Sequence, residues 1–200
     1  KNNSDKAITF ISENGFREER SWYELNLNVS KISRFLKSIK IKKKDRIAAY
    51  LPNSIETVEA FISSSSLGAI WSSCSPDFGV KGVVERFSQI NPKVLFVTDK
   101  YFYNGKTINI LERIPYILKK IPSIKYVVVV NYPGEKYLQS KYKYKKVKMF
   151  RWSDLIKIES QKIQFRQFDF EQELAILYSS GTTGKPKCIC HRSGGVLLQH

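Results

Sequence analysis

The sequence is most informative at Leu174-Ala175-Ile176-Leu177-Tyr178-Ser179-Ser180-Gly181-Thr182-Thr183-Gly184-Lys185-Pro186-Lys187. Its first four residues form a short apolar run, which predicts a buried parallel strand. Glycines, hydroxyl-bearing residues and lysines follow this run. A strand that leads directly into such a loop is suited to holding a polyphosphate.

The loop offers three kinds of phosphate ligand. Its glycines allow a tight turn and a close approach of the backbone to an anion, and successive N–H groups can form an anion-binding nest. Hydroxyl groups and ammonium groups add further donors and positive charge. The candidate phosphate ligands are Ser179, Ser180, Gly181, Thr182, Thr183, Gly184, Lys185 and Lys187.

This stretch differs from the Walker A loop. That motif has four residues between its glycines and a Ser or Thr after its lysine, whereas two residues separate Gly181 from Gly184 and Pro186 follows Lys185. The alternative is a solvated surface turn. Ten consecutive residues of this type behind a strand favour the phosphate-binding interpretation.

The sequence between residues 43 and 130 alternates between strand and helix patterns. This alternation predicts an α/β fold, a parallel sheet with flanking helices on both faces. We expect strands at residues 46–51, 69–73, 93–98 and 125–130, and helices at 55–67, 79–89 and, with an interruption near Pro115, 108–121.

Local signals also define both ends of the chain. Asn14-Gly15, flanked by residues 8–11 and 16–22, predicts a β-hairpin, and Ser21 with Glu24 forms a capping box for a helix that extends to Ser38. Residues 131–168 are irregular and basic, with a short helix expected at 153–159 and capped by Ser153. The strand at Leu174 is expected to begin another sheet region.

The charge of the chain leaves a second class of function open. The formal net charge is +16, and Lys141-Tyr142-Lys143-Tyr144-Lys145-Lys146 combines cations with aromatic rings that could stack on bases. The lysines are nevertheless spread along the chain, and this cluster is typical of a solvated loop. We therefore expect small-molecule substrates rather than nucleic acid.

The cysteines and the apolar runs limit the cellular context. Three cysteines in 200 residues make no disulfide framework, and reduced cytoplasmic thiols are expected. Cys188-Ile189-Cys190-His191 is better explained by a strand than by a metal site, because no second pair of ligands accompanies it. No apolar run has membrane-spanning length, and residues 1–6 show no cleavable signal pattern, so no membrane partner is expected.

The 178–187 stretch resembles the phosphate loop of the adenylate-forming superfamily, which includes acyl-CoA synthetases, luciferases and the adenylation domains of peptide synthetases. Residues 46–54, Arg-Ile-Ala-Ala-Tyr-Leu-Pro-Asn-Ser, resemble an early strand and turn of that superfamily. Residues 68–79 and 101–106 are similar to a narrower group, the acetoacetyl-CoA synthetases.

The resemblance implies an enzyme. Its reaction would activate acetoacetate with ATP to acetoacetyl-AMP and then form acetoacetyl-CoA, with Mg²⁺ accompanying the phosphates and coenzyme A as the thiol. It also implies that residues 1–200 are a partial N-terminal AMP-binding domain. The adenine-binding segment, the ribose-binding aspartate, the hinge and the C-terminal domain with its catalytic lysine are absent, so the fragment alone is expected to be inactive.

The resemblance suggests further contacts with the substrates. Tyr103, Asn104, Gly105 and Lys106 occupy the place of an Arg-Gly-Gly-Arg-type loop that contacts coenzyme A in related acetyl-CoA synthetases, although only Gly105 and Lys106 keep that chemistry. The resemblance also makes His191 a candidate for a residue that lines the acyl side of the site. Trp71 and Phe78 are expected to pack in the core, and Cys74 is expected to be a small buried apolar residue.

Two alternatives remain open. The first keeps the chemistry and changes the acid to acetate, propionate or another short chain. The second is a basic nucleic-acid-binding domain, which predicts steeply salt-dependent binding to oligonucleotides.

Overall fold

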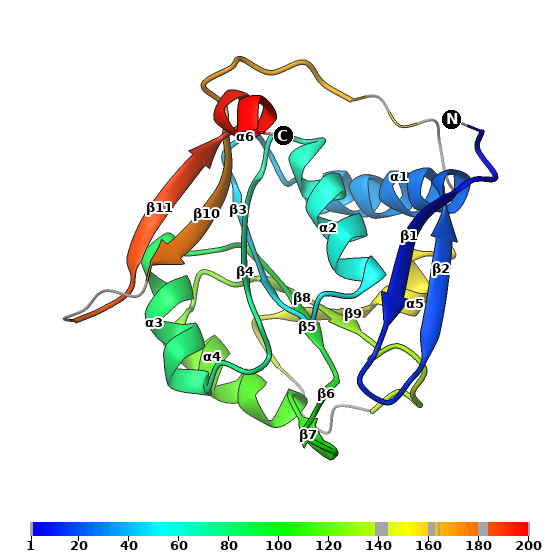
Figure 1. Cartoon of the computed structure of the whole chain (residues 1–200). Coiled ribbons are helices and arrows are strands. Elements are labelled where there is room, and N and C mark those ends of the chain that lie inside the picture. The colour runs from blue at the N-terminus through cyan, green and yellow to red at the C-terminus, as the bar shows by residue number, and fades with distance from the viewer. Residues whose placement is uncertain (1, 139–143, 160–162, 164, 180–183, 200) are drawn as a thin grey trace.

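The central feature of the structure, a computed structural model that describes residues 2–138, 144–159, 163, 165–179 and 184–199, is a seven-stranded sheet (Figure 1). Its strand order is β11-β10-β4-β3-β5-β8-β9. The strands are β3 (Arg46–Tyr50), β4 (Ile70–Cys74), β5 (Val94–Thr98), β8 (Tyr126–Val130), β9 (Lys148–Arg151), β10 (Glu173–Ser179) and β11 (Lys187–Arg192).

The pairing of the strands confirms the predicted parallel sheet. All neighbouring pairs from β10 to β9 are parallel, and only β11 runs antiparallel, to β10. Helices cover both faces, as Figure 1 shows. The helices are α1 (Trp22–Ser38), α2 (Ile55–Ser65), α3 (Val80–Ile90), the 3₁₀ helix η1 (Leu111–Arg113), α4 (Ile114–Lys120), α5 (Trp152–Leu155) and α6 (Ser193–Gln199).

Each central strand contributes to two separate cores because successive side chains point to opposite faces. In β3, Ile47 and Ala49 pack with α1, α2 and α5, whereas Ala48 and Tyr50 pack with α3, η1 and α4. All four of these residues are fully buried. The near-continuous apolar character of the central strands is therefore a consequence of burial on both sides.

The N-terminal segment folds as its local signals predict. β1 (Lys6–Ile11) and β2 (Arg17–Ser21) form an antiparallel hairpin, and Gly15 takes a positive φ of 80° in its turn. Ser21 caps α1: its side chain accepts from the Glu24 N–H, and the Glu24 carboxylate accepts from the Ser21 N–H. The predicted capping box and the predicted helix end at Ser38 are both confirmed.

Residues 100–121 differ from the expected interrupted helix. They begin with a small hairpin of β6 (Lys100–Tyr103) and β7 (Lys106–Asn109), followed by η1 and α4. Pro115 lies in the first turn of α4, where its missing N–H leaves no hydrogen bond unmade. The expected interruption is therefore confirmed, but Ile108 belongs to a strand.

The carboxyl-terminal half brings four corrections. β9 is a strand where an irregular segment was expected, and Arg151 rather than Ser153 occupies the N-cap of α5. The strand at Leu174 joins the same sheet, beside β4, instead of starting another. It is also only half-buried, with Leu177 46% exposed, whereas the central strands are buried on both faces.

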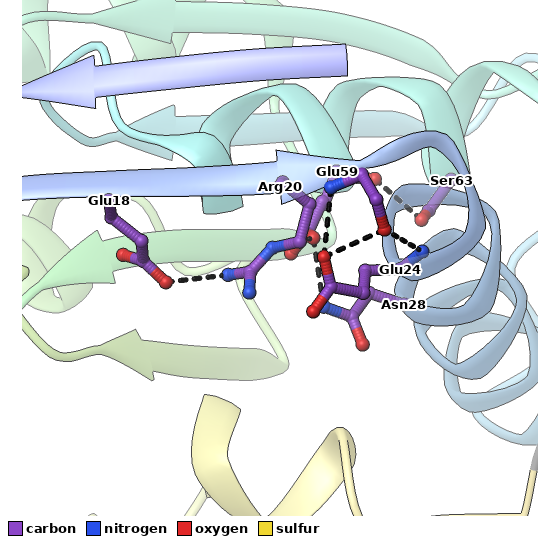
Figure 2. A network of polar contacts seen from close by, with 7 residues as sticks. Glu18, Arg20, Glu24, Asn28, Glu59 and Ser63 are labelled. Carbon is purple, nitrogen blue, oxygen red and sulfur yellow. Dashed lines mark hydrogen bonds and ion pairs between the residues drawn. The ribbon is translucent and has the colours of Figure 1, made fainter. Parts of the chain in front are cut away.

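A buried polar network joins the N-terminal hairpin to the helices (Figure 2). Glu59 on α2 is fully buried, and its carboxylate accepts a hydrogen bond of 2.8 Å from the Asn28 amide on α1. Arg20 on β2 lies 3.3 Å from the same oxygen and also pairs with Glu18 at 2.9 Å. Burial raises the pKa of Glu59 to about 7, outweighing the effects of Asn28 and Arg20.

We expect Glu59 to make the stability of the protein depend on pH. Because its pKa is raised, the folded state binds the proton more tightly than the unfolded chain, so stability falls as the pH rises from about 4.5 to about 7. Relative to Glu59→Gln, the free energy of unfolding of the unmodified protein should drop by up to about 3 kcal/mol across this window.

Urea unfolding at a series of pH values measures this difference. Glu85→Gln, at an exposed position of α3, is the matched control and should follow the unmodified protein. Parallel pH profiles for the unmodified protein and Glu59→Gln would contradict the prediction.

Candidate active site

The candidate functional residues gather around one edge of the sheet. Parallel strands end at the same edge, so the loops after β3, β4, β5 and β10 share the side on which open α/β sheets bind their ligands. The residues at these strand ends are Tyr50, Cys74, Thr98 and Ser179.

The predicted phosphate loop connects the two strands of a hairpin. Ser179 at the end of β10 lies opposite Lys187 at the start of β11, and Tyr178 lies opposite Cys188. Ser179 is half-buried and Lys187 is exposed. The structure therefore brings a hydroxyl-bearing and a cationic candidate residue together at the base of the loop.

The other loop candidates are placed as follows. Gly184 and Lys185 are exposed, and Gly184 has a φ of 99°, a backbone conformation that favours glycine. Ser180, Gly181, Thr182 and Thr183 lie outside the described residues.

Side chains from the rest of the sheet hold the end of β10. The Ser72 hydroxyl on β4 donates to the Ile176 carbonyl at 2.8 Å and lies 3.1 Å from the Tyr178 hydroxyl. The Arg86 guanidinium on α3 lies 4.2 Å from the centre of the Phe78 ring and 5.8 Å from that of Tyr178. Burial raises the pKa of Tyr178, which keeps its hydroxyl protonated as a neutral partner.

A pocket of about 240 Å³ opens between the ends of β3 and β4. Burial raises the pKa of the Cys74 thiol in its wall to about 12, so this cysteine is a neutral lining group rather than a nucleophile. Asp77 accepts a hydrogen bond of 2.8 Å from Ser75 at its rim. The pocket is lined by Leu51, Pro52, Asn53, Thr57, Ser73, Cys74, Ser75, Asp77 and Tyr101.

Tyr50 and Arg113 fix one wall of this pocket. The Tyr50 hydroxyl donates to the carbonyls of Pro76 at 3.2 Å and Phe78 at 2.6 Å. Arg113 on η1 donates to the same two carbonyls, each at 3.1 Å, and to the Tyr50 hydroxyl. This clamp determines where the backbone that carries Asp77 runs.

Asp99 organises the neighbouring strand end in the same way. It is fully buried and accepts N–H hydrogen bonds from Lys100, Tyr132 and Leu138, each at 2.8 Å. Burial raises its pKa, while these three donors oppose the rise. Asp99 therefore joins the start of β6 to the segment that follows β8.

The candidate coenzyme A residues form the β6–β7 turn. Tyr103 and Lys106 are paired across the hairpin, and Asn104 and Gly105 have φ values of 50° and 71°. Positive φ at both central residues defines a type I′ turn. The four residues are exposed, and Figure 1 shows β6 and β7 well apart from β10 and β11. Tyr101, on the same strand β6, lines the pocket.

The remaining candidates separate into core and surface. Trp71 and Cys74 are buried, as predicted, whereas Phe78 is 38% exposed under the Arg86 guanidinium. His191 is half-buried on β11, in the strand predicted for Cys188–His191, where Cys188 and Cys190 are both exposed. The sequence analysis did not single out Asp99, Tyr50 or Arg113. The position of Asp99 directly after an apolar strand could have marked it as a candidate.

The described residues, 2–138, 144–159, 163, 165–179 and 184–199, contain neither a cluster of three metal-ligating side chains nor a membrane-spanning helix. Within these ranges, no three His, Cys, Asp or Glu side chains are grouped to hold a metal ion. None of the helices there is both long and apolar enough to cross a membrane.

Comparisons with known proteins agree with this architecture. A family model described as AMP-binding enzyme matches residues 1–199. Acetoacetyl-CoA synthetase of Xenopus tropicalis is 41% identical over 202 residues, which cover 98% of this chain and 30% of the relative. Malonamoyl-CoA synthetase of Penicillium aethiopicum is 38% identical over 202 residues, covering 98% and 28%.

A solved structure is similar over the same region. Acetoacetyl-CoA synthetase from Streptomyces lividans superposes with a TM-score of 0.86 at 30% sequence identity, covering 97% of this chain and 29% of that one. The chain thus spans about 30% of the length of the curated relatives that it matches.

We expect Tyr50→Phe to destabilise the fold because the Pro76 and Phe78 carbonyls lose one of their two donors and keep only Arg113. The loss of a hydrogen bond of this kind costs about 1 kcal/mol. Urea unfolding checks this, with Tyr116→Phe as the control, because Tyr116 is 42% exposed. Equal stability of the two variants would show that the clamp contributes nothing.

Proposed function

Because this chain belongs to the AMP-binding enzyme family, we propose that it is part of an ATP-dependent acyl-CoA synthetase. The relatives that it matches are about three times its length, since it spans about 30% of them. In this proposal residues 1–200 are a partial N-terminal domain, and further segments of the enzyme, including a C-terminal domain, complete its catalytic centre.

The proposed reaction has two steps. In the first, an oxygen of the carboxylate attacks the α-phosphorus of ATP, and pyrophosphate leaves as acyl-AMP forms. In the second, the coenzyme A thiol loses its proton and attacks the acyl carbonyl, and AMP leaves as the thioester forms. The role of this chain in the first step is to stabilise the charge that develops on pyrophosphate.

The observation that carries this proposal is the pairing of Ser179 with Lys187 at the base of the glycine-rich loop. It places a hydroxyl-bearing and an ammonium-bearing residue opposite each other at the ligand-binding edge of the sheet. The β- and γ-phosphates of ATP would lie against this base. Positive charge at such a position also favours the binding of ATP itself.

We propose acetoacetate as the acid. Support comes from relatives named acetoacetyl-CoA synthetase that are 41% and 39% identical to this chain. Malonamoyl-CoA synthetase is similar to nearly the same degree, at 38%. Acetoacetyl and malonamoyl groups both carry a carbonyl at the third carbon, so a short carboxylate with this carbonyl is the class that we propose. A substrate panel that includes acetate and propionate tests it.

Mg²⁺ is expected to enter bound to the ATP phosphates, because this ion usually pairs with substrate phosphates and keeps several waters. The described residues include no cluster of metal-binding side chains. We assign no catalytic step to the ion.

Coenzyme A is proposed to bind along the β6–β7 hairpin. Lys106 offers an exposed cation for a phosphate of the coenzyme. Tyr101 connects this hairpin to the pocket between β3 and β4, which would give the remainder of the coenzyme a partly polar channel.

The spread of the lysines supports small-molecule partners rather than nucleic acid, and the free thiols of Cys74, Cys188 and Cys190 support a cytoplasmic setting.

Lys187→Ala in the full-length enzyme should lower acetoacetate-dependent ATP–pyrophosphate exchange by about a hundredfold, the usual effect of losing one donor to the transition state. The thermal midpoint should change little, because Lys187 is exposed. Lys37→Ala, an exposed lysine at the end of α1, is the control. Exchange at the parental rate in folded Lys187→Ala would remove Lys187 from the site.

Lys106→Ala should raise the KM for coenzyme A about fivefold in thioester formation, as expected for one exposed ionic contact. The exchange reaction needs no coenzyme A and should proceed unchanged. Thr107→Ala, next to Lys106 on the same hairpin and also exposed, controls for disturbance of β7. An unchanged KM would place the coenzyme elsewhere.

A further inference from the structure

Helix α3 lies against the base of the β10–β11 hairpin. Two of its side chains, Arg86 and Gln89, are three positions apart and therefore share a face of the helix. Arg86 reaches the Tyr178 ring on β10, and Gln89 reaches the segment at the start of β11. One helical turn thus contacts both strands of the hairpin at the end that carries the candidate loop.

The Gln89 side chain makes three contacts through its amide group. Its nitrogen donates to the Pro186 carbonyl at 2.9 Å and to the Glu85 carbonyl at 2.8 Å. Its oxygen accepts from the Cys188 thiol at 3.6 Å. The bond to Glu85 lies within α3, so the helix itself holds the amide in the orientation that meets Pro186 and Cys188.

These contacts hold the two residues that precede and follow Lys187 in the sequence. Pro186 has no N–H, so its carbonyl is the only backbone group through which this residue can be fixed by a hydrogen bond. Cys188, on the other side, pairs with Tyr178 across the hairpin. With Pro186 and Cys188 both tied to Gln89, the backbone of Lys187 has a defined position although its side chain is exposed.

We propose that Gln89 is a positioning residue that fixes Lys187 by holding the carbonyl of Pro186. The inference rests on the proposed function, because there Lys187 is a ligand of the ATP phosphates. In this proposal Gln89 acts through the backbone of Pro186 and does not itself contact ATP, the carboxylate or coenzyme A. A ligand on a fixed backbone binds phosphate with a smaller loss of conformational entropy, so the effect belongs to ATP binding.

Three variants of the full-length enzyme test this inference. Gln89→Met keeps the length of the side chain and removes its hydrogen bonds, whereas Gln89→Asn keeps the amide and shortens its reach. Ser88→Ala, an exposed neighbour on α3, is the control. Two measurements are made on each folded protein: the KM for ATP and kcat in carboxylate-dependent exchange, and the rate of trypsin cleavage after Lys187, identified by mass spectrometry.

Both Gln89 variants should raise the KM for ATP about five- to tenfold, in keeping with the loss of one hydrogen bond, with little change in kcat or thermal midpoint. Cleavage after Lys187 should become several-fold faster, and Ser88→Ala should match the parent in both assays. Unchanged cleavage in both Gln89 variants, or an unchanged KM, would overturn the inference. If the parent shows no exchange, the proposed function has failed, and the cleavage rate still decides whether Gln89 fixes Lys187.

Discussion

The central strands must bury both of their faces, and the rest of the molecule follows from this requirement. In β3, alternate side chains enter two different cores, so a helix layer is needed on each side of the sheet. α1, α2 and α5 supply one layer, and α3 and α4 supply the other. Crossovers between parallel strands then leave the carboxyl ends of these strands on one edge, where loops are free to carry chemistry.

Polar groups give that edge its shape. The loops after β3, β4 and β5 cannot satisfy their backbone groups through the sheet, and buried groups without partners are costly. Asp99 meets three N–H groups, and Tyr50 with Arg113 meets the carbonyls of Pro76 and Phe78. Structural hydrogen bonding therefore also defines the walls of the candidate pocket.

The sequence predicted those features whose cause lies within a few neighbouring residues. The Ser21–Glu24 capping box, the turn at Asn14-Gly15 and the strand–helix alternation are of this kind. Features that depend on distant partners were missed: β9 exists because it pairs with β8, and the clamp joins Tyr50 to Arg113 across 63 positions. For the candidate site, the sequence predicted the chemical groups of the loop but not the contact of α3 with the β10–β11 hairpin, because no local pattern connects a helix to a hairpin about a hundred residues later.

The attachment of β10 to the sheet has a mechanical consequence. Among the described residues, β10 and β4 share a single backbone pair, Ala175 with Trp71, whereas β3 and β4 share five. The β10–β11 hairpin is thus attached to the sheet mainly by side-chain contacts, such as that of Ser72, and not by a full ladder of backbone hydrogen bonds. Displacing it breaks few main-chain bonds to the rest of the seven-stranded sheet, so among the strands of this sheet the β10–β11 hairpin can move at the smallest cost in backbone pairing.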